Sequence, residues 1–248
     1  MNFYSRISEF YDSMIGFDRF LDSQIKTYGV FLKKYPVKTA VDTACGSGFH
    51  SIALAKSGVK VIGSDIDGAM LKSASKNAER YGVDIKWVRA PFHRMHNKIG
   101  ATVDAVFCMG NSIPHLLTPK SLIMSLKSFA DTLKPNGVLV IQLLNYTGIL
   151  QSGERIINIR RDKNDEYIRF YDFLSAKRVR FNILKVDWNG ESPKHIIYST
   201  VLRPYSAKDL ADTLKQAGFA DIETFADIDF SVYDKDKSIL TTLIAHKG

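Results

Sequence analysis

Between residues 38 and 145, short apolar segments alternate with segments of helical pattern, and no other feature constrains the fold as strongly. The apolar segments have the length and composition of buried strands, and they read KTAVDTA, VKVIGSD, DIKWVRA, TVDAVFCM and VLVIQLLN. Segments 48–58, 67–82 and 121–133 carry helical spacing, and Gly58 and Gly82 end the first two. This alternation predicts an α/β fold, a doubly wound parallel sheet with helices on both faces.

The flanking segments predict one domain over 1–248, with additions on both sides of a core at 37–146. Apolar side chains recur at helical spacing in 1–36 until Tyr35-Pro36, so we expect an N-terminal cap of one or two helices. Segment 150–204 holds four strand-like stretches joined by the turns RDKND and NGESP, which predicts an antiparallel β insert that serves as a lid. Residues 205–248 supply an amphipathic helix and two closing strands.

Composition fits an ordinary globular chain, with 45% hydrophobic and 24% charged residues. No apolar run approaches the roughly 20 residues of a membrane span. The N-terminal MNFYSRISEFYDS lacks the apolar core of a signal peptide. We therefore expect a cytoplasmic protein that does not enter a membrane, in which Cys45 and Cys108 stay reduced.

The net charge of +8 raises the possibility of a nucleic-acid partner. Residues 154–203 contain eleven Lys and Arg against seven Asp and Glu, and the remaining excess is spread along the chain. Because no run of five or six like charges occurs, a solvated basic surface is the favoured interpretation. A surface that faces RNA stays open as the alternative.

The stretch VDTACGSGFH, residues 41–50, carries the first indication of a ligand. In a doubly wound sheet, ligands bind beyond the carboxyl ends of the strands, where small residues expose a helix N-terminus. Asp42 precedes the glycines, so it disfavours a pyrophosphate and suits a ligand with an ammonium group. Asp65 ends the next strand, where a carboxylate can accept both hydroxyls of a ribose. A cationic ligand with a free ribose diol fits S-adenosylmethionine.

Four segments in order resemble the cofactor motifs of class I S-adenosylmethionine-dependent methyltransferases: DTACGSG, VIGSDIDGAMLKSA, DAVFCMGNSIPHL and LKPNGVLVIQ. Within that class, the Ala-Cys-Gly variant, GNSIPHL and NYTGIL are most similar to the glycine N-methyltransferase and glycine/sarcosine methyltransferase group. The resemblance implies a Rossmann-like sheet of seven strands and methyl transfer without a metal. His93 and His96 form a pair with no third ligand, which is typical of a loop.

The resemblance also implies which residues bind the cofactor. Residues of the first turn would line the methionine part of the cofactor, and Asp65 would bind the ribose. Ile66 and Met70 would flank the adenine, and the end of the fourth strand would form the wall behind the sulfonium. The family's acidic residue after the third strand is missing, so the backbone around Ala90 and Pro91 would meet the adenine amine. The full set is Asp42, Ala44, Cys45, Gly46, Gly48, Asp65, Ile66, Met70, Ala90, Pro91, Phe92, Cys108, Met109 and Gly110.

Three residues are implied on the acceptor side. His115 is a general base or a residue that packs against the cofactor, and Asn111 orients the acceptor or caps a turn. Tyr11 offers a hydroxyl or a cation–π surface. Glycine enzymes carry an arginine for the substrate carboxylate where this chain has Leu144, so glycine is a doubtful acceptor, and Arg155 or another insert arginine is the possible replacement.

These features predict transfer of a methyl group from S-adenosylmethionine to a small-molecule amine by in-line displacement. Two alternatives stay open: methylation of RNA or another macromolecule through the basic insert, and a noncatalytic protein that only binds S-adenosylmethionine. Aromatic residues of the insert fit either a cage over the site or ordinary sheet packing: Tyr167, Phe170, Tyr171, Phe173, Tyr198 and Tyr205. The acceptor and the oligomeric state are not determined by the sequence.

Overall fold

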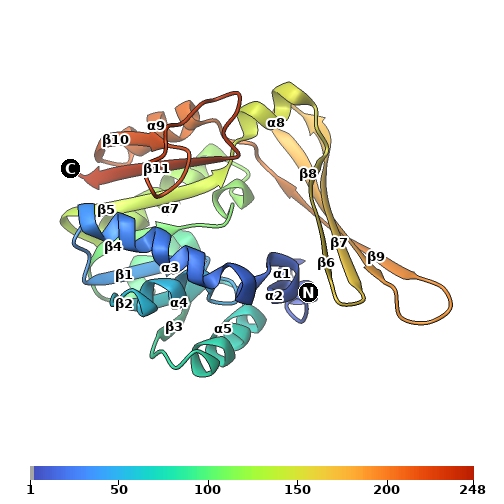
Figure 1. The fold of residues 1–248 in the computed structure, drawn as a ribbon. Coiled ribbons are helices and arrows are strands. Elements are labelled where there is room, and N and C mark those ends of the chain that lie inside the picture. The colour runs from blue at the N-terminus through green and yellow to red at the C-terminus, as the bar shows by residue number, and fades with distance from the viewer. Residues whose placement is uncertain (1–2) are drawn as a thin grey trace.

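The computed structural model describes residues 3–248, and its largest element is a seven-stranded sheet in the order β10-β11-β5-β4-β1-β2-β3 (Figure 1). Strands β1 to β5 are parallel, while β11 is antiparallel to both of its neighbours. The predicted seven-stranded, doubly wound α/β fold is confirmed. The strand bounds are β1 (Thr39–Thr43), β2 (Lys60–Asp65), β3 (Lys86–Arg89), β4 (Val103–Cys108), β5 (Leu133–Leu144), β10 (Phe219–Phe225) and β11 (Leu240–Lys247).

Helices cover both faces of this sheet, and each face has its own apolar core. On β1, Ala40 packs into the core beneath α3, α4 and α5, whereas Val41 packs into the core beneath α6, α7 and α9. No helix within residues 3–248 is long and apolar enough to cross a membrane. The helix bounds are α3 (Phe17–Lys34), α4 (Phe49–Lys56), α5 (Gly68–Arg80), η1 (Phe92–Arg94), α6 (Met95–Ile99), η2 (Ile113–His115), α7 (Pro119–Thr132) and α9 (Ala207–Gln216).

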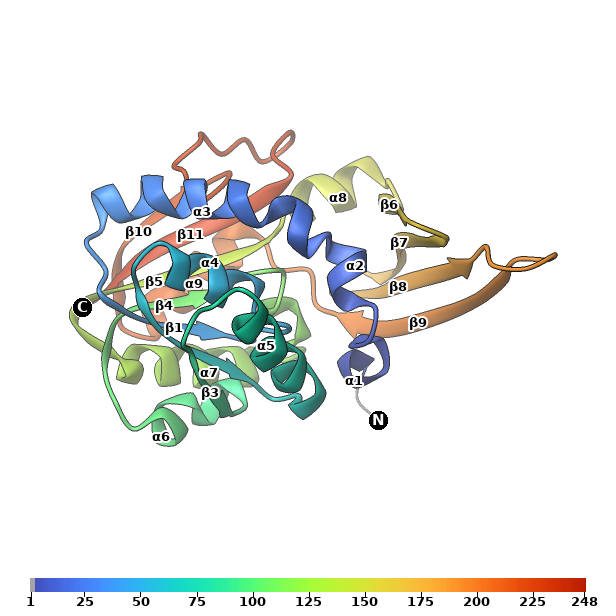
Figure 2. The ribbon, with the colours of Figure 1, turned by 60° about the horizontal axis from the view of Figure 1, so that its bottom comes forward.

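A second sheet follows β5 through α8 (Tyr146–Ser152), and its strands are all antiparallel in the order β6-β7-β8-β9. Helices α1 (Phe3–Ile7) and α2 (Tyr11–Ile15) pack against this second sheet, and α1 also contacts α5, which covers the seven-stranded sheet (Figure 2). The N-terminal helices therefore join the two sheets. The strand bounds are β6 (Ile156–Asp162), β7 (Asp165–Ser175), β8 (Arg178–Asp187) and β9 (Lys194–Leu202).

The N-terminal cap contains three helices, where the sequence predicted one or two. Gly16 has φ of 72° and separates α2 from α3. A Cβ atom at this position would lie 2.1 Å from Nη2 of Arg160, so the break also makes room for a side chain of the second sheet. The spacing of apolar residues continues across the break, which is why the pattern alone did not reveal it.

Gly63 in β2 allows Trp87 of β3 to lie directly against the sheet, since a Cβ atom would come within 2.2 Å of the indole ring. We expect Gly63→Ala to lower the free energy of unfolding by about 1 to 3 kcal/mol, because the indole would have to shift within a packed core. Urea denaturation measures this change. Gly29→Ala in α3 is the control, because a Cβ atom there meets nothing within 4 Å; equal midpoints for the two variants would contradict the explanation.

Candidate active site

Two buried carboxylates lie at the carboxyl ends of β1 and β2. Asp65 accepts hydrogen bonds from the backbone N–H of Gly46 at 2.9 Å and of Asp67 at 2.8 Å, so one side chain connects the turns after both strands. Asp42 is 1% exposed and accepts a hydrogen bond from the Ser51 hydroxyl at 2.6 Å. Burial raises the pKa of Asp65, and burial together with the charge of Asp65 raises the pKa of Asp42 to about 7.

The turn between β1 and α4 has a left-handed backbone at three positions, Ala44, Gly46 and Gly48. At Gly46 the backbone is open towards Tyr11, whose ring atoms lie 3.7 Å or more from where a Cβ would be. At Gly48 a Cβ atom would come within 3.0 Å of Trp87 and 3.2 Å of Ala74. The first glycine thus exposes backbone to the site, and the second lets α4 pack closely on its neighbours.

These residues open onto a cavity of about 750 Å³ at the carboxyl edge of the sheet. Eleven of the fourteen residues predicted to bind a cofactor line it, and they come from four separate turns. The eleven are Asp42, Ala44, Cys45, Gly46, Asp65, Ile66, Ala90, Pro91, Phe92, Met109 and Gly110.

The other three predicted residues lie outside this cavity, which corrects the sequence interpretation. Gly48 serves the packing just described. Met70 lies on the side of α5 that faces α1 and is fully buried with Ile7 and Met14. Cys108 points into the core below the sheet edge, where burial raises the pKa of its thiol. Spacing placed these residues next to the site in sequence but did not show the direction of their side chains.

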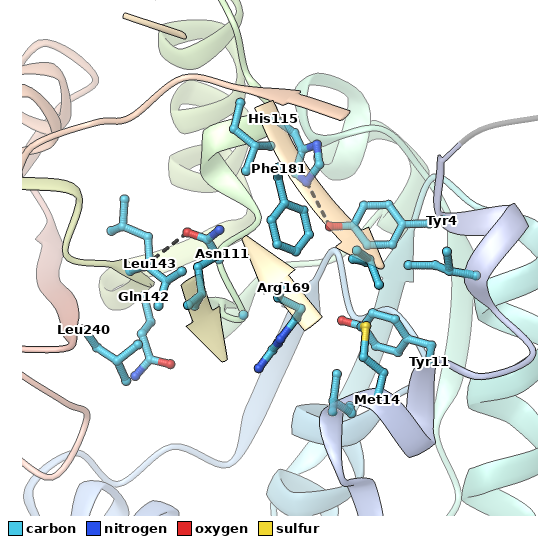
Figure 3. A pocket seen from close by; sticks show the side chains of 17 residues that line it. Tyr4, Tyr11, Met14, Asn111, His115, Gln142, Leu143, Arg169, Phe181 and Leu240 are labelled. Atoms are coloured by element: carbon cyan, nitrogen blue, oxygen red, sulfur yellow. Dashed lines mark hydrogen bonds between the residues drawn. The ribbon is translucent and has the colours of Figure 1, made fainter. Parts of the chain in front are cut away.

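A second cavity of about 200 Å³ adjoins the first and reaches the β6–β9 sheet (Figure 3). Six residues line both cavities and so form the boundary where the two adjoin, here called the passage: Tyr4, Tyr11, Ile15, Gly110, His115 and Arg169. Two of the three residues predicted on the acceptor side, Tyr11 and His115, lie in this passage, and the third, Asn111, lines the smaller cavity only. The tertiary structure thus brings together residues from α2, the β4 turn and β7.

A protein-family model described as a methyltransferase domain matches residues 40–137. Glycine/sarcosine N-methyltransferase of Halorhodospira halochloris is 28% identical over 219 residues, which are 87% of this chain and 79% of that protein. Glycine N-methyltransferase of Rattus norvegicus is 35% identical over 133 residues, 49% of this chain and 45% of that protein. This chain is a class I S-adenosylmethionine-dependent methyltransferase.

Solved structures share the whole fold of this methyltransferase at low sequence identity. An S-adenosylmethionine-dependent methyltransferase from Clostridium acetobutylicum superposes with a TM-score of 0.81 at 18% identity and covers 100% of both chains. The CcbJ methyltransferase from Streptomyces caelestis gives 0.77 at 17% identity and covers 92% of this chain and 90% of that one. The similarity extends over the second sheet as well as the central one.

His115 lies in the methyltransferase as a partly buried, neutral imidazole. Its Nε2 atom is 2.8 Å from the hydroxyl of Tyr4, and burial lowers its pKa to about 4. Such an imidazole is a weak proton acceptor near pH 7 and is well suited to hold a neighbour in position. Its role as a base stays a prediction.

Asn111 has both ends of its side chain engaged. Its Nδ2 donates to the hydroxyl of Tyr146 at 3.0 Å, and its Oδ1 accepts from the backbone N–H of Leu144 at 3.1 Å. The Tyr146 hydroxyl lies 3.0 Å from that of Tyr171 in β7, so Asn111 connects the β4 turn to β5 and, through Tyr146, to the second sheet. A contact between Asn111 and an acceptor molecule would use the second N–H of Nδ2 or the remaining lone pair of Oδ1.

Several residues of the site were missed by sequence reasoning. Tyr4 lies in the passage, and Gln24 and Thr27 of α3 line the larger cavity. Polar side chains recur at helical spacing within the otherwise apolar N-terminal cap, and this pattern could have indicated that one face of α3 lines a polar site. Arg169 had no such signal, because it is one of many charged residues that alternate along the insert strands.

The pH dependence of stability tests the buried carboxylate of Asp42. Its folded pKa of about 7 exceeds the unfolded value, so the folded protein binds the extra proton, and ionisation opposes folding increasingly as pH rises towards and through 7. We expect Asp42→Asn to stabilise the ligand-free protein by about 2 to 4 kcal/mol at pH 8 and by much less at pH 5. Thermal unfolding at both pH values checks this.

The exposed Asp131 on α7 provides the control, since Asp131→Asn changes the same functional group in solvent. Its effect on stability is expected to be small at both pH values, because the side chain is exposed. A stability gain in Asp42→Asn that is equal at pH 5 and pH 8 would show that ionisation of Asp42 is not the cause.

Proposed function

We propose that this methyltransferase N-methylates a small-molecule amine, with S-adenosylmethionine in the larger cavity and the acceptor in the smaller one. The observation that carries this proposal is the boundary that the two cavities share, which Tyr11, Gly110 and His115 line from both sides. A methyl donor and an acceptor can meet there while protein side chains surround both. The similarity to glycine/sarcosine N-methyltransferases supports an amine acceptor.

The residues present fit S-adenosylmethionine. No Lys, Arg or His of residues 3–248 lies within 4.0 Å of the buried Asp42 carboxylate, which therefore suits an ammonium group. Each oxygen of Asp65 is fixed by one backbone N–H and keeps a lone pair for a hydroxyl of the ribose diol. When bound, the cofactor supplies a methyl group on a positively charged sulfur, which is already activated for displacement.

The protein's own contribution is then position and exclusion of water. Tyr4, Tyr11 and His115 are partly buried around the passage, and desolvation there raises the pKa of Tyr11 to about 12, so all three are neutral near pH 7. Their rings and hydroxyls can hold a nucleophilic nitrogen in line with the methyl group without competing as strong bases. Only an unprotonated nitrogen has the lone pair that displaces the sulfonium, so the acceptor amine would react in its neutral form and give an N-methylammonium product and S-adenosylhomocysteine.

The test uses methyl-labelled S-adenosylmethionine, the purified protein, and cell extract separated by filtration into small molecules and macromolecules. Label in small molecules that survives ribonuclease treatment supports the proposal, and mass spectrometry then identifies the product. Label in macromolecules that disappears with ribonuclease would replace it with RNA methylation. Binding of the cofactor with no label in either fraction would indicate a noncatalytic protein.

Asp65→Ala tests the assignment of the larger cavity. We expect it to weaken S-adenosylmethionine binding by about one to two orders of magnitude, because charged hydrogen bonds to a diol are lost. Isothermal calorimetry measures the affinity, with Asp131→Ala as a control that removes a surface carboxylate. An unchanged dissociation constant in Asp65→Ala would remove this residue from the cofactor site.

A further inference from the structure

Arg169 in β7 is a partly buried cation that has no hydrogen-bond or ion-pair partner for its guanidinium within residues 3–248. Its side chain lines both cavities, and it contributes the one Lys or Arg found among the lining residues within 3–248 (Figure 3). Its Nε has no hydrogen-bond acceptor, and no carboxylate of the described chain lies within 4.0 Å of its guanidinium. Burial lowers the pKa of the Arg169 guanidinium. Keeping such a charge in place costs free energy that a bound anion would recover.

The other arginines of the second sheet line neither cavity, although the Nε of Arg160 also lacks an acceptor. Arg155 and Arg180 both pair with Asp172 outside the cavities. Arg161 lies over the ring of Trp188 at 5.7 Å, and Arg160 over that of Phe20 at 5.3 Å. The sequence suggested Arg155 or another insert arginine as the replacement; Arg155 lines neither cavity, and Arg169 is the insert arginine that does.

The rest of the smaller cavity is mainly apolar. Its walls include Leu143, Leu144, Ile157, Phe181, Ile183 and Leu202. Its volume of about 200 Å³ can be compared with an apolar cavity of about 150 Å³, which accepts benzene. Glycine has no apolar group to fill such a space, whereas an amino acid with an apolar side chain does.

We propose that the acceptor is an α-amino acid with an apolar side chain, and that Arg169 binds its carboxylate. This inference rests on the proposed function. The amine would lie at the passage beside Tyr11 and His115, and the side chain among the apolar walls. A single guanidinium matches the single charge of a carboxylate, and its planar fork can donate two parallel hydrogen bonds.

Arg169 also borders the larger cavity, so the anion that it binds has a second candidate, the carboxylate of S-adenosylmethionine. The position of Arg169 in the sheet favours the acceptor. Ile183 lies directly opposite Arg169 in the ladder, and both Ile183 and Phe181 line the smaller cavity only. Arg169 thus belongs to the wall of the smaller cavity, where we propose that the acceptor binds.

The experiment compares leucine and phenylalanine with glycine and with isopentylamine and phenethylamine, the amines that lack the carboxylate, in the methyl-labelled assay. We expect kcat/KM for leucine or phenylalanine to exceed that for glycine and for the matching amine by at least about tenfold. Arg169→Leu should raise KM for the amino acid by about 10- to 100-fold and leave KM for the amine unchanged. Arg169→Lys should fall between, because it keeps the charge but not the fork.

Arg161→Leu is the matched control, since it removes a guanidinium from the same sheet outside both cavities. Calorimetry with S-adenosylhomocysteine shows that each variant folds and reports the cofactor site separately. If Arg169→Leu weakens this binding and leaves the acceptor KM unchanged, the anion is the cofactor's and the inference is overturned. Equal rates for amino acids and matching amines overturn it too but leave N-methylation intact. If no amine in the panel is labelled, the inference fails, and the fractionated extract then decides the proposed function.

Discussion

The rest of the structure depends on holding two buried carboxylates and one partly buried guanidinium in a single site. Asp42 and Asp65 place two carboxylates at the ends of neighbouring strands, and Arg169 of the second sheet places a guanidinium in the lining of the same cavity. Charges of this kind are expensive to bury, and the raised pKa values of the carboxylates and the lowered one of the guanidinium express that cost. Ligands of complementary charge recover this free energy. The groups that lower the stability of the free protein therefore stabilise the protein with its ligands bound.

The surrounding fold supplies the stability that these charges remove. Both faces of the central sheet are buried, as Ala40 and Val41 on adjacent positions of β1 show. Asp65 connects the two turns that carry the carboxylates, and Asn111 connects the β4 turn to β5 and, through Tyr146 and Tyr171, to the second sheet. The site is therefore built on the rims of rigid elements, and α1 and α2 complete it from the other side.

Local sequence patterns predicted most of the seven-stranded sheet and its helices. Strand and helix periods of the core segments are independent of distant contacts, so the seven strands and their helices follow from them. Strand ends in a parallel sheet meet at one edge, which is why Asp42 and Asp65 could be placed together. Such reasoning failed for Met70 and for Gly16, since it could not show which face of α5 meets α1 or that Arg160 occupies the space beside the glycine.

The sequence by itself determined the α/β architecture, the antiparallel insert and a ligand site at the first two strand ends, because each depends on the order and period of nearby residues. Only the tertiary structure decided how the insert faces that site. Arg169 is more than a hundred residues from Asp42 and Asp65 in the chain, and its alternating neighbours resemble those of any half-exposed strand. Its direction is fixed by the packing of β7 against α1 and α2, a long-range contact that no local pattern encodes.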